Sequence, residues 1–146
     1  MNVLVINGPN INLLGIREPK IYGKKTYDEL VDFINQSACE AGINVDIFQS
    51  NCEGEIINKI QSSAGVYDGM IINAAGYAHT SVAIHDAIKA VGVLCVGVHL
   101  TDPDKREAFR HIDIVGMACS SVIKGEGFDS YKKALILLKN NIKGSA

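Results

Sequence analysis

The first 23 residues join a short apolar run, MNVLVI (residues 1–6), to a longer mixed segment, NGPNINLLGIREPKIYG (residues 7–23). The apolar run is typical of a buried β-strand. The segment after it contains the asparagine and proline that mark loops. It also keeps apolar residues that a solvent-exposed loop does not need: Ile11, Leu13, Leu14 and Ile21. We therefore expect a strand that leads into a loop whose apolar residues pack over another group instead of facing solvent.

Apolar runs and stretches with helical periodicity alternate along the rest of the chain. Strands are expected at Val3–Ile6, Ile43–Phe48, Gly69–Asn73, Val93–Leu100 and Ser121–Lys124. Helices are expected at Thr26–Ala41, Glu55–Ser63, Ser81–Val91 and Ser130–Asn141. This alternation predicts an α/β fold, with a five-stranded parallel sheet covered by helices on both faces. No linker or repeat interrupts the 146 residues, which predicts a single domain over residues 1–146.

Two of the predicted helices carry clear start signals. Thr26 and Glu29 have the spacing of a capping box, in which each side chain accepts from the other residue's backbone N–H. Gly42 follows the first helix and is a suitable stop. Ser81 is a candidate N-cap for the third helix.

Composition and charge exclude several classes of protein. Apolar residues make up 47% of the chain and charged residues 21%, which is typical of an ordered globular protein. The net charge is −2 and no block of like charges occurs, so neither nucleic acid nor a membrane surface is an expected partner. No apolar run approaches the ~20 residues needed to span a bilayer. The N-terminus also lacks the features of a signal peptide.

The cysteines and histidines do not have the spacing of a metal site. Cys39, Cys52, Cys95 and Cys119 are scattered and form no CxxC pair, so we interpret them as reduced thiols of a cytoplasmic protein. His79 and His85 are six residues apart and do not share a helix face. No metal is expected.

Polar residues concentrate in the loops that follow the predicted strands. Open α/β sheets bind ligands beyond the carboxyl ends of their strands. The loops expected there are residues 7–23, 49–55, 73–81 and 99–111, and all are rich in ionisable and polar side chains. GxxxxGK[ST] and GxGxxG are both absent, which argues against the usual nucleotide-binding sites. The N-terminal apolar run lacks the acidic residues that a receiver domain places beside its first strand. The loop after it lacks the Ser/Thr-rich phosphate-binding sequence of a flavodoxin-type electron carrier.

Arg17 and Tyr22 form the first candidate pair. Tyrosine has an ordinary pKa of about 10, and a nearby guanidinium can lower it. The pair would then supply a general base in a loop that closes over substrate, with Gly15 and Gly23 as hinges. The alternative is that both are surface residues.

Two histidines and two arginines are expected at the same edge of the sheet. His79 and His99 lie at or near strand ends, where they would either perform acid–base chemistry or serve a structural role. Arg106 and Arg110 are four residues apart and are expected on one face of a short helix. They would form either a clamp for an anion or hydroxyl group or a solvated basic face.

Several motifs resemble one family closely. NGPNINLLGIREPKIYG, FQSNCEGE, YAHTSVAIHDA, VHLT and REAFRH occur in the order found in type II 3-dehydroquinate dehydratases, and the resemblance spans residues 3 to about 138. It implies a flavodoxin-like three-layer α/β/α sandwich. It also implies dehydration of 3-dehydroquinate to 3-dehydroshikimate through an enolate, with no cofactor, no metal and no Schiff-base lysine. The expected assembly is a homo-oligomer, a dodecamer built from trimers.

The resemblance also implies roles for individual residues. Tyr22 matches the general base, Arg17 the arginine that supports it, Asn12 the residue that holds a water against the enolate oxygen, and His99 the general acid. The substrate-binding set is matched by Asn73 with the Leu100–Thr101 backbone for the carboxylate, His79 and Arg110 for the ring hydroxyls, and Asp86 for a neighbouring subunit's site.

Some positions depart from the family pattern. Gly97 stands where the family usually has a glutamate that orients the histidine, so Asp102 or a water is expected to orient His99 instead. Cys52, Ala74, Asp102 and His85 are milder departures. Gly97 leaves open a binding module of the same fold that has lost catalysis. The pattern does not distinguish aromatic amino-acid biosynthesis from quinate breakdown.

Overall fold

Five parallel strands form one sheet in the computed structural model, which describes residues 1–145. Their spatial order is β2-β1-β3-β4-β5. Their bounds are β1 (Asn2–Asn7), β2 (Asn44–Gln49), β3 (Gly69–Asn73), β4 (Leu94–His99) and β5 (Ser121–Lys124). This is the strand order of flavodoxin-like folds. The predicted fold class is therefore confirmed.

The first strand explains why residues 1–6 are continuously apolar. β1 pairs with both β2 and β3, and its residues Val3 to Ile6 are fully buried. Successive side chains of a strand point to opposite faces of the sheet. Val3 and Val5 accordingly join one core cluster, and Leu4 and Ile6 join the other. A strand covered on both faces needs apolar residues without alternation.

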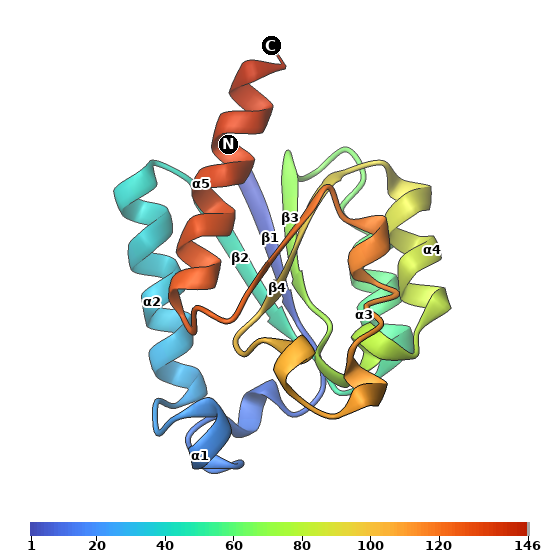
Figure 1. Cartoon of the computed structure of the whole chain (residues 1–146). Helices are drawn as coiled ribbons and strands as arrows, with labels where there is room; N and C mark the ends of the chain where they lie inside the picture. Colours follow the sequence, from blue (N-terminus) through green and yellow to red (C-terminus); the bar gives the residue numbers. More distant parts are fainter. Residues whose placement is uncertain (146) are drawn as a thin grey trace.

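Helices cover both faces of the sheet. α2 (Tyr27–Ala41) and α5 (Asp129–Gly144) lie on one face, and α3 (Glu53–Gln61) and α4 (Val82–Val91) lie on the other (Figure 1). A further short helix that the sequence does not predict, α1 (Pro19–Tyr22), lies inside the loop after β1. This arrangement gives the three predicted layers.

The predicted helix caps are present. The Thr26 hydroxyl accepts from the Glu29 N–H at 3.2 Å, and the Thr26 N–H donates to the Glu29 carboxylate at 2.7 Å. Gly42 ends α2 with a φ of 67°, which favours glycine. The Ser81 hydroxyl accepts from the Ile84 N–H at 2.9 Å at the start of α4.

Several helix boundaries differ from the prediction by one to three residues. α3 begins at Glu53 rather than Glu55, and its first turn carries two acidic residues that the positive end of the helix dipole stabilises. α5 continues past the predicted end at Asn141 to Gly144 because Ile142 packs against the core. Ala146, the last residue of the predicted domain, lies outside the described residues.

The loop after β1 is only partly folded into the core. Ile11 and Leu14 are 3% exposed, whereas Leu13 and Ile21 are 41% and 42% exposed. The first two residues anchor the loop against the core cluster beneath α2 and α5. The loop is therefore fixed at its start and open towards α1.

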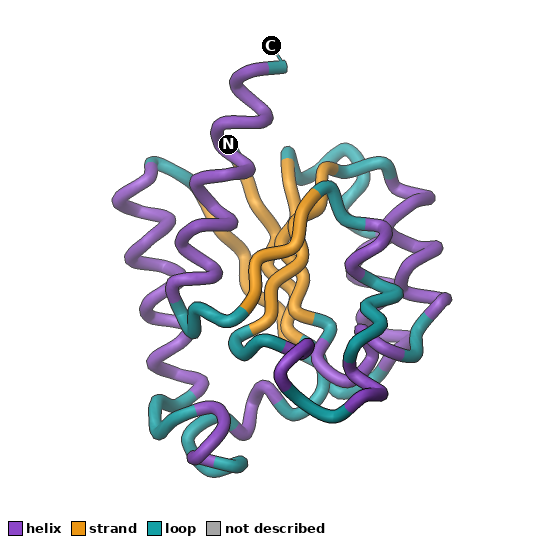
Figure 2. The backbone as a smooth tube through the Cα atoms, in the orientation of Figure 1, coloured by secondary structure: helices purple, strands orange, loops and turns teal. Residues whose placement is uncertain are grey.

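The loops and short helical turns that follow β1, β3 and β4 gather at one end of the sheet, at the bottom of the view (Figure 2). This is the carboxyl end of the strands, where the sequence places the site. Within residues 1–145, no helix has the length and apolar character required to cross a membrane.

Candidate active site

A cleft opens at the carboxyl ends of β1, β3 and β4. It is lined by Ile11, Arg17, Tyr22, Asn73, Ala75, Gly76, His79, His99, Leu100, Thr101, Pro103, Arg106 and Arg110. All but two of the predicted site residues are in this set. The exceptions are Asn12, which lies in the middle of the loop's first 3-10 turn, η1 (Ile11–Leu13), and Asp86, which lies on α4.

Tyr22 is held between two arginines. It lies at the end of α1, and its hydroxyl accepts a hydrogen bond of 2.6 Å from Arg106 Nη1. The guanidinium carbon of Arg17 lies 4.8 Å from the centre of the Tyr22 ring, and that of Arg106 lies 5.2 Å from it. Positive charge at these positions stabilises negative charge that develops on the phenol oxygen. The sequence-based pairing of Arg17 with Tyr22 is thus present in the geometry, and Arg106 joins it.

Arg106 and Arg110 do not share a helix, contrary to the prediction. Arg110 ends the 3-10 turn η4 (Ala108–Arg110), whereas Arg106 follows the 3-10 turn η3 (Pro103–Lys105) and is extended, with φ −114° and ψ −162°. The extended backbone at Arg106 interrupts what would otherwise be a continuous helix. Both side chains nevertheless line the cleft.

Arg106 is the functional candidate whose role the sequence reasoning missed. Its side chain is 13% exposed, and its Nη2 atom is buried without a hydrogen-bond partner among residues 1–145. A buried guanidinium nitrogen without a partner is costly, so its presence indicates a site built to receive an acceptor. The only signal in the sequence was the four-residue spacing from Arg110, which indicated a clamp but not a contact with Tyr22.

Asn73 belongs to a buried polar chain beneath the cleft. Its Nδ2 donates to the Tyr131 hydroxyl at 3.0 Å, and its Oδ1 accepts from the Ala75 N–H at 3.2 Å. The Tyr131 hydroxyl donates in turn to Asn7 Oδ1 at 2.6 Å. Burial raises the pKa of Tyr131, which keeps it neutral and able to donate. The chain joins the ends of β1 and β3 to α5 and fixes the floor of the cleft.

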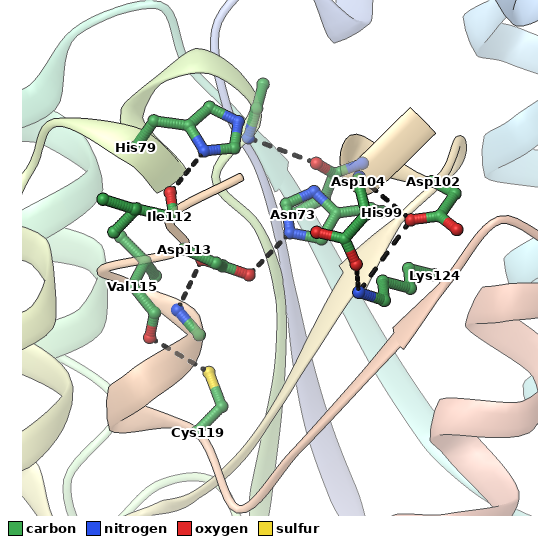
Figure 3. A network of polar contacts seen from close by, with 12 residues as sticks. Asn73, His79, His99, Asp102, Asp104, Ile112, Asp113, Val115, Cys119 and Lys124 are labelled. Carbon is green, nitrogen blue, oxygen red and sulfur yellow. Dashed lines mark hydrogen bonds and ion pairs between the residues drawn. The ribbon is translucent and has the colours of Figure 1, made fainter. Parts of the chain in front are cut away.

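His99 is oriented by Asp113, not by Asp102. Its Nε2 lies 2.7 Å from Asp113 Oδ2, as Figure 3 shows. Asp102 instead accepts from the Asp104 N–H at 3.1 Å and lies 3.9 Å from Lys124 Nζ. The expectation of Asp102 is therefore wrong. Asp102 is the N-cap of η3, and its carboxylate accepts from the backbone of that turn rather than from His99.

His79 and His99 lie side by side. Their rings stack with centres 6.2 Å apart and planes 11° apart. His79 Nδ1 lies 2.7 Å from the Ile112 carbonyl oxygen (Figure 3). A carbonyl only accepts, so Nδ1 carries the proton of neutral His79.

The remaining predicted residues are placed as follows. The Arg110 Nε donates to Glu107 at 2.7 Å, which fixes its guanidinium at the rim. Asn12 is exposed and its side-chain oxygen accepts from Gln49 at 3.3 Å. Asp86 is 70% exposed and contacts His85 on the same helix. Asp86 therefore does not reach the cleft of its own chain.

A flavodoxin-like sheet that ends in a cleft with an arginine-held tyrosine and a carboxylate-held histidine defines an enzyme of the acid–base class. The sequence model of the family described as "Dehydroquinase class II" matches residues 1–139. The chain belongs to this family.

Relatives support this membership over nearly the whole chain. A protein named 3-dehydroquinate dehydratase from Clostridium perfringens (strain 13 / Type A) is 49% identical over 144 residues, which cover 98% of this chain and 99% of the relative. One of the same name from Caldicellulosiruptor bescii is 50% identical over 138 residues, covering 94% and 95%. The crystal structure of type II dehydroquinase from Butyrivibrio crossotus DSM 2876 superposes with a TM-score of 0.93 at 43% identity, covering 95% of this chain and 97% of that one.

Proposed function

We propose that this chain, acting as one catalytic domain, is a type II 3-dehydroquinate dehydratase. It is a hydro-lyase that converts 3-dehydroquinate to 3-dehydroshikimate and water, in aromatic amino-acid biosynthesis or in quinate breakdown. The observation that carries the proposal is the 2.6 Å hydrogen bond from Arg106 to the Tyr22 hydroxyl, in the same cleft as His99. An arginine-supported tyrosine and a histidine supply the base and the acid that such a dehydration needs.

The first step is removal of a proton. The Tyr22 oxygen, as phenolate, takes the proton from the carbon beside the ketone, and Arg17 and Arg106 stabilise the phenolate before transfer. The electrons of the C–H bond move onto the ketone oxygen as an enolate. A water held by Asn12 donates to that oxygen, because donors aimed at developing charge lower the barrier.

The second step is loss of the hydroxyl group. The enolate collapses, the C–O bond breaks, and the leaving oxygen takes a proton from His99 to depart as water. Tyr22 ends the cycle protonated and His99 ends it deprotonated. One proton passing from Tyr22 to solvent and one from solvent to His99 restore the enzyme, so no external oxidant or reductant is consumed.

Substrate binding is proposed for the other residues of the cleft. Asn73 and the backbone N–H groups of Leu100 and Thr101 bind the substrate carboxylate. His79 and Arg110 bind the ring hydroxyls. The hydrogen bonds that hold His79 and Arg110 in place support this role, because fixed polar groups give up less conformational freedom when a ligand binds.

A homo-oligomer, with trimers assembled into a dodecamer, is proposed for the active unit. Asp86 is exposed and remote from its own cleft, which supports a role in the cleft of a neighbouring subunit. Several large apolar side chains on the surface also suit a subunit interface: Val82, Phe109, Ile112 and Met117. We place the protein in the cytoplasm, because its four cysteines are free thiols in the described structure.

The test is addition of 3-dehydroquinate to the purified protein. The proposal predicts rising absorbance of the conjugated enone of 3-dehydroshikimate in wild type. Tyr22→Phe should fold normally and lose at least ~10²-fold in turnover. Tight binding of 3-dehydroquinate without enone formation would overturn the enzyme proposal and favour the binding module that Gly97 left open.

A further inference from the structure

The acid step requires a histidine that holds its transferable proton on one defined ring nitrogen. A carboxylate that accepts from one ring nitrogen fixes both the rotamer and the tautomer of an imidazole. A side chain at position 97 would share the strand face of His99, but Gly97 has none. A Cβ there would lie 3.2 Å from Val122 Cγ2 and 3.5 Å from Cys119 Sγ, so neighbouring side chains already occupy this side. The orienting group must come from another element.

We propose that Asp113 is the positioning residue for His99, and that it fixes the imidazole with its proton on Nε2 so that Nδ1 exchanges the catalytic proton. The carboxylate reaches His99 from the segment between η4 and η5 (Gly116–Ala118), and not from strand β4 itself. The effect of Asp113 on turnover rests on the proposed function, whereas its effect on the tautomer of His99 does not.

The carboxylate is itself held at both oxygens. Oδ2 lies 2.7 Å from His99 Nε2, and Oδ1 accepts from the Gly116 N–H, also at 2.7 Å. A Cβ at position 116 would collide with the Asp113 carboxylate, so any side chain there would displace the carboxylate from its present position. The two side chains of the pair are 11% (His99) and 26% (Asp113) exposed, so water screens the pair only in part.

The segment that carries Asp113 is anchored beside both histidines. The Val115 N–H donates to the Ala78 carbonyl at 3.2 Å, one residue before His79. The Ile112 carbonyl accepts from His79. Residues 112–115 therefore hold the orientation of both imidazoles, and a change at Asp113 is expected to act on His99 through one defined hydrogen bond.

The ionisation of Asp113 fits this role. Burial raises the pKa of the carboxyl, but the hydrogen bonds from His99 and the Gly116 N–H outweigh burial, and the pKa lies below its ordinary value. The group is thus a carboxylate at neutral pH. A carboxylate only accepts, so Nε2 must donate and Nδ1 is the free nitrogen of neutral His99.

The first experiment reads the tautomer directly. Two-bond ¹H–¹⁵N spectra of the ring nitrogens distinguish protonated from bare nitrogen, and His99→Gln identifies the His99 signals among the four histidines. We expect Nε2–H in wild type. In Asp113→Asn the amide keeps the acceptor for Gly116 but presents a donor to Nε2, so the His99 proton should move to Nδ1. A wild-type Nδ1–H tautomer, or no change in Asp113→Asn, would overturn the inference.

The second experiment reads turnover. Asp113→Asn should lower kcat by roughly 10- to 100-fold, the range found when an orienting partner is removed, with KM within about threefold of wild type because ground-state binding is untouched. The other charged or titratable groups near the pair (His79, Asp104, Arg110, His111 and Lys124) are unchanged in this variant.

Asp104→Asn is the matched control. Asp104 is an exposed carboxylate in the same region, but it pairs with Lys124 and makes no hydrogen bond to His99. Its kcat should stay within about twofold of wild type, since exposed pairs are weak. Equal losses in the two variants would contradict a specific role for Asp113. A wild type without dehydratase activity would overturn only the proposed function, because the tautomer spectrum does not depend on turnover.

Discussion

The two halves of the cleft hold their proton-transfer groups in opposite ways. Tyr22 is surrounded by the guanidinium groups of Arg17 and Arg106, whereas His99 is bonded to the carboxylate of Asp113. Cations stabilise a group that has lost a proton, and an anion stabilises a group that has gained one. One end of the cleft is thus arranged to take a proton and the other to give one. A dehydration that removes a proton and then protonates a leaving hydroxyl needs this arrangement.

The halves also differ in how they are built. The base half comes mainly from one continuous loop, residues 7–23, and Arg106 is added from the residue that follows η3. The acid half joins the end of β4 to a segment 14 residues further on. The loop is open towards α1, while the His99–Asp113 pair is mostly buried. We infer that the acid half is the more rigid part of the site.

The largest effect is expected from removing the acid. His99→Gln keeps a polar side chain of similar length but has no titratable group, and turnover should fall by roughly 10²- to 10⁴-fold. Steady-state rates from enone absorbance measure this. A loss of less than about tenfold, or ~1.4 kcal/mol of barrier, would show that the leaving hydroxyl takes its proton elsewhere and would remove His99 from the comparison.

The next largest fall in turnover is expected when the support of Tyr22 in the base half is altered. Arg106→Lys keeps the charge but loses the planar fork that bonds the Tyr22 hydroxyl, and a lysine ammonium cannot reproduce that geometry. We expect a fall in kcat of roughly 10- to 100-fold, about 1.4 to 2.7 kcal/mol of barrier. Lys105→Ala, an exposed neighbour outside the cleft lining, is the control and should stay near wild type. Unchanged kcat in Arg106→Lys would leave Arg17 as the sole support of the base.

The fold and the Arg17–Tyr22 pair of the base half could be predicted from the sequence. Strands and helices follow from apolar periodicity and from local caps such as Thr26 with Glu29, which depend on residues close in the chain. Tyr22 and Arg17 are likewise neighbours in one motif. The contact of Arg106 with Tyr22 and that of Asp113 with His99 could not be predicted, because both residues lie in irregular backbone next to 3-10 turns, where apolar periodicity does not indicate the direction of a side chain. Gly97 indicated that a carboxylate was missing, but the replacement lies on another element, and only the fold brings it to His99.

A third prediction concerns the floor that joins the two halves. Tyr131→Phe removes the hydroxyl that links Asn7 to Asn73 and leaves both buried amides short of a partner. The free energy of unfolding should fall by about 1–3 kcal/mol, measured by urea denaturation. Tyr67→Phe is the control, since its hydrogen bond to Asp46 is exposed, and it should lose about 1 kcal/mol or less. Equal losses in both variants would mean that the buried hydrogen bonds of Tyr131 contribute no more to stability than an exposed hydrogen bond does.

The smallest expected effect is on the pH dependence of the unfolding free energy, and it tests the ionisation of Asp113 in the acid half. The pKa of Asp113 is lowered in the folded protein, so its contribution to stability is complete above the unfolded value, about 3.9, and is lost as pH falls through the lower folded value. Asp113→Asn removes this contribution. Its unfolding free energy should therefore decline less steeply than that of wild type below about pH 4. Parallel curves for the two proteins would contradict an ionised Asp113 bonded to His99.

The most direct test of the opposed halves is hydrogen exchange in D₂O. If Tyr22 takes the proton and His99 releases the hydroxyl, His99→Gln should still form the enolate and return it to substrate, because only the second step is blocked. Recovered 3-dehydroquinate should then carry deuterium at the carbon beside the ketone while product forms slowly. Tyr22→Phe should incorporate no deuterium above the enzyme-free rate. Wild-type deuterium uptake in Tyr22→Phe, or none in His99→Gln, would contradict the assignment of base and acid to the two halves.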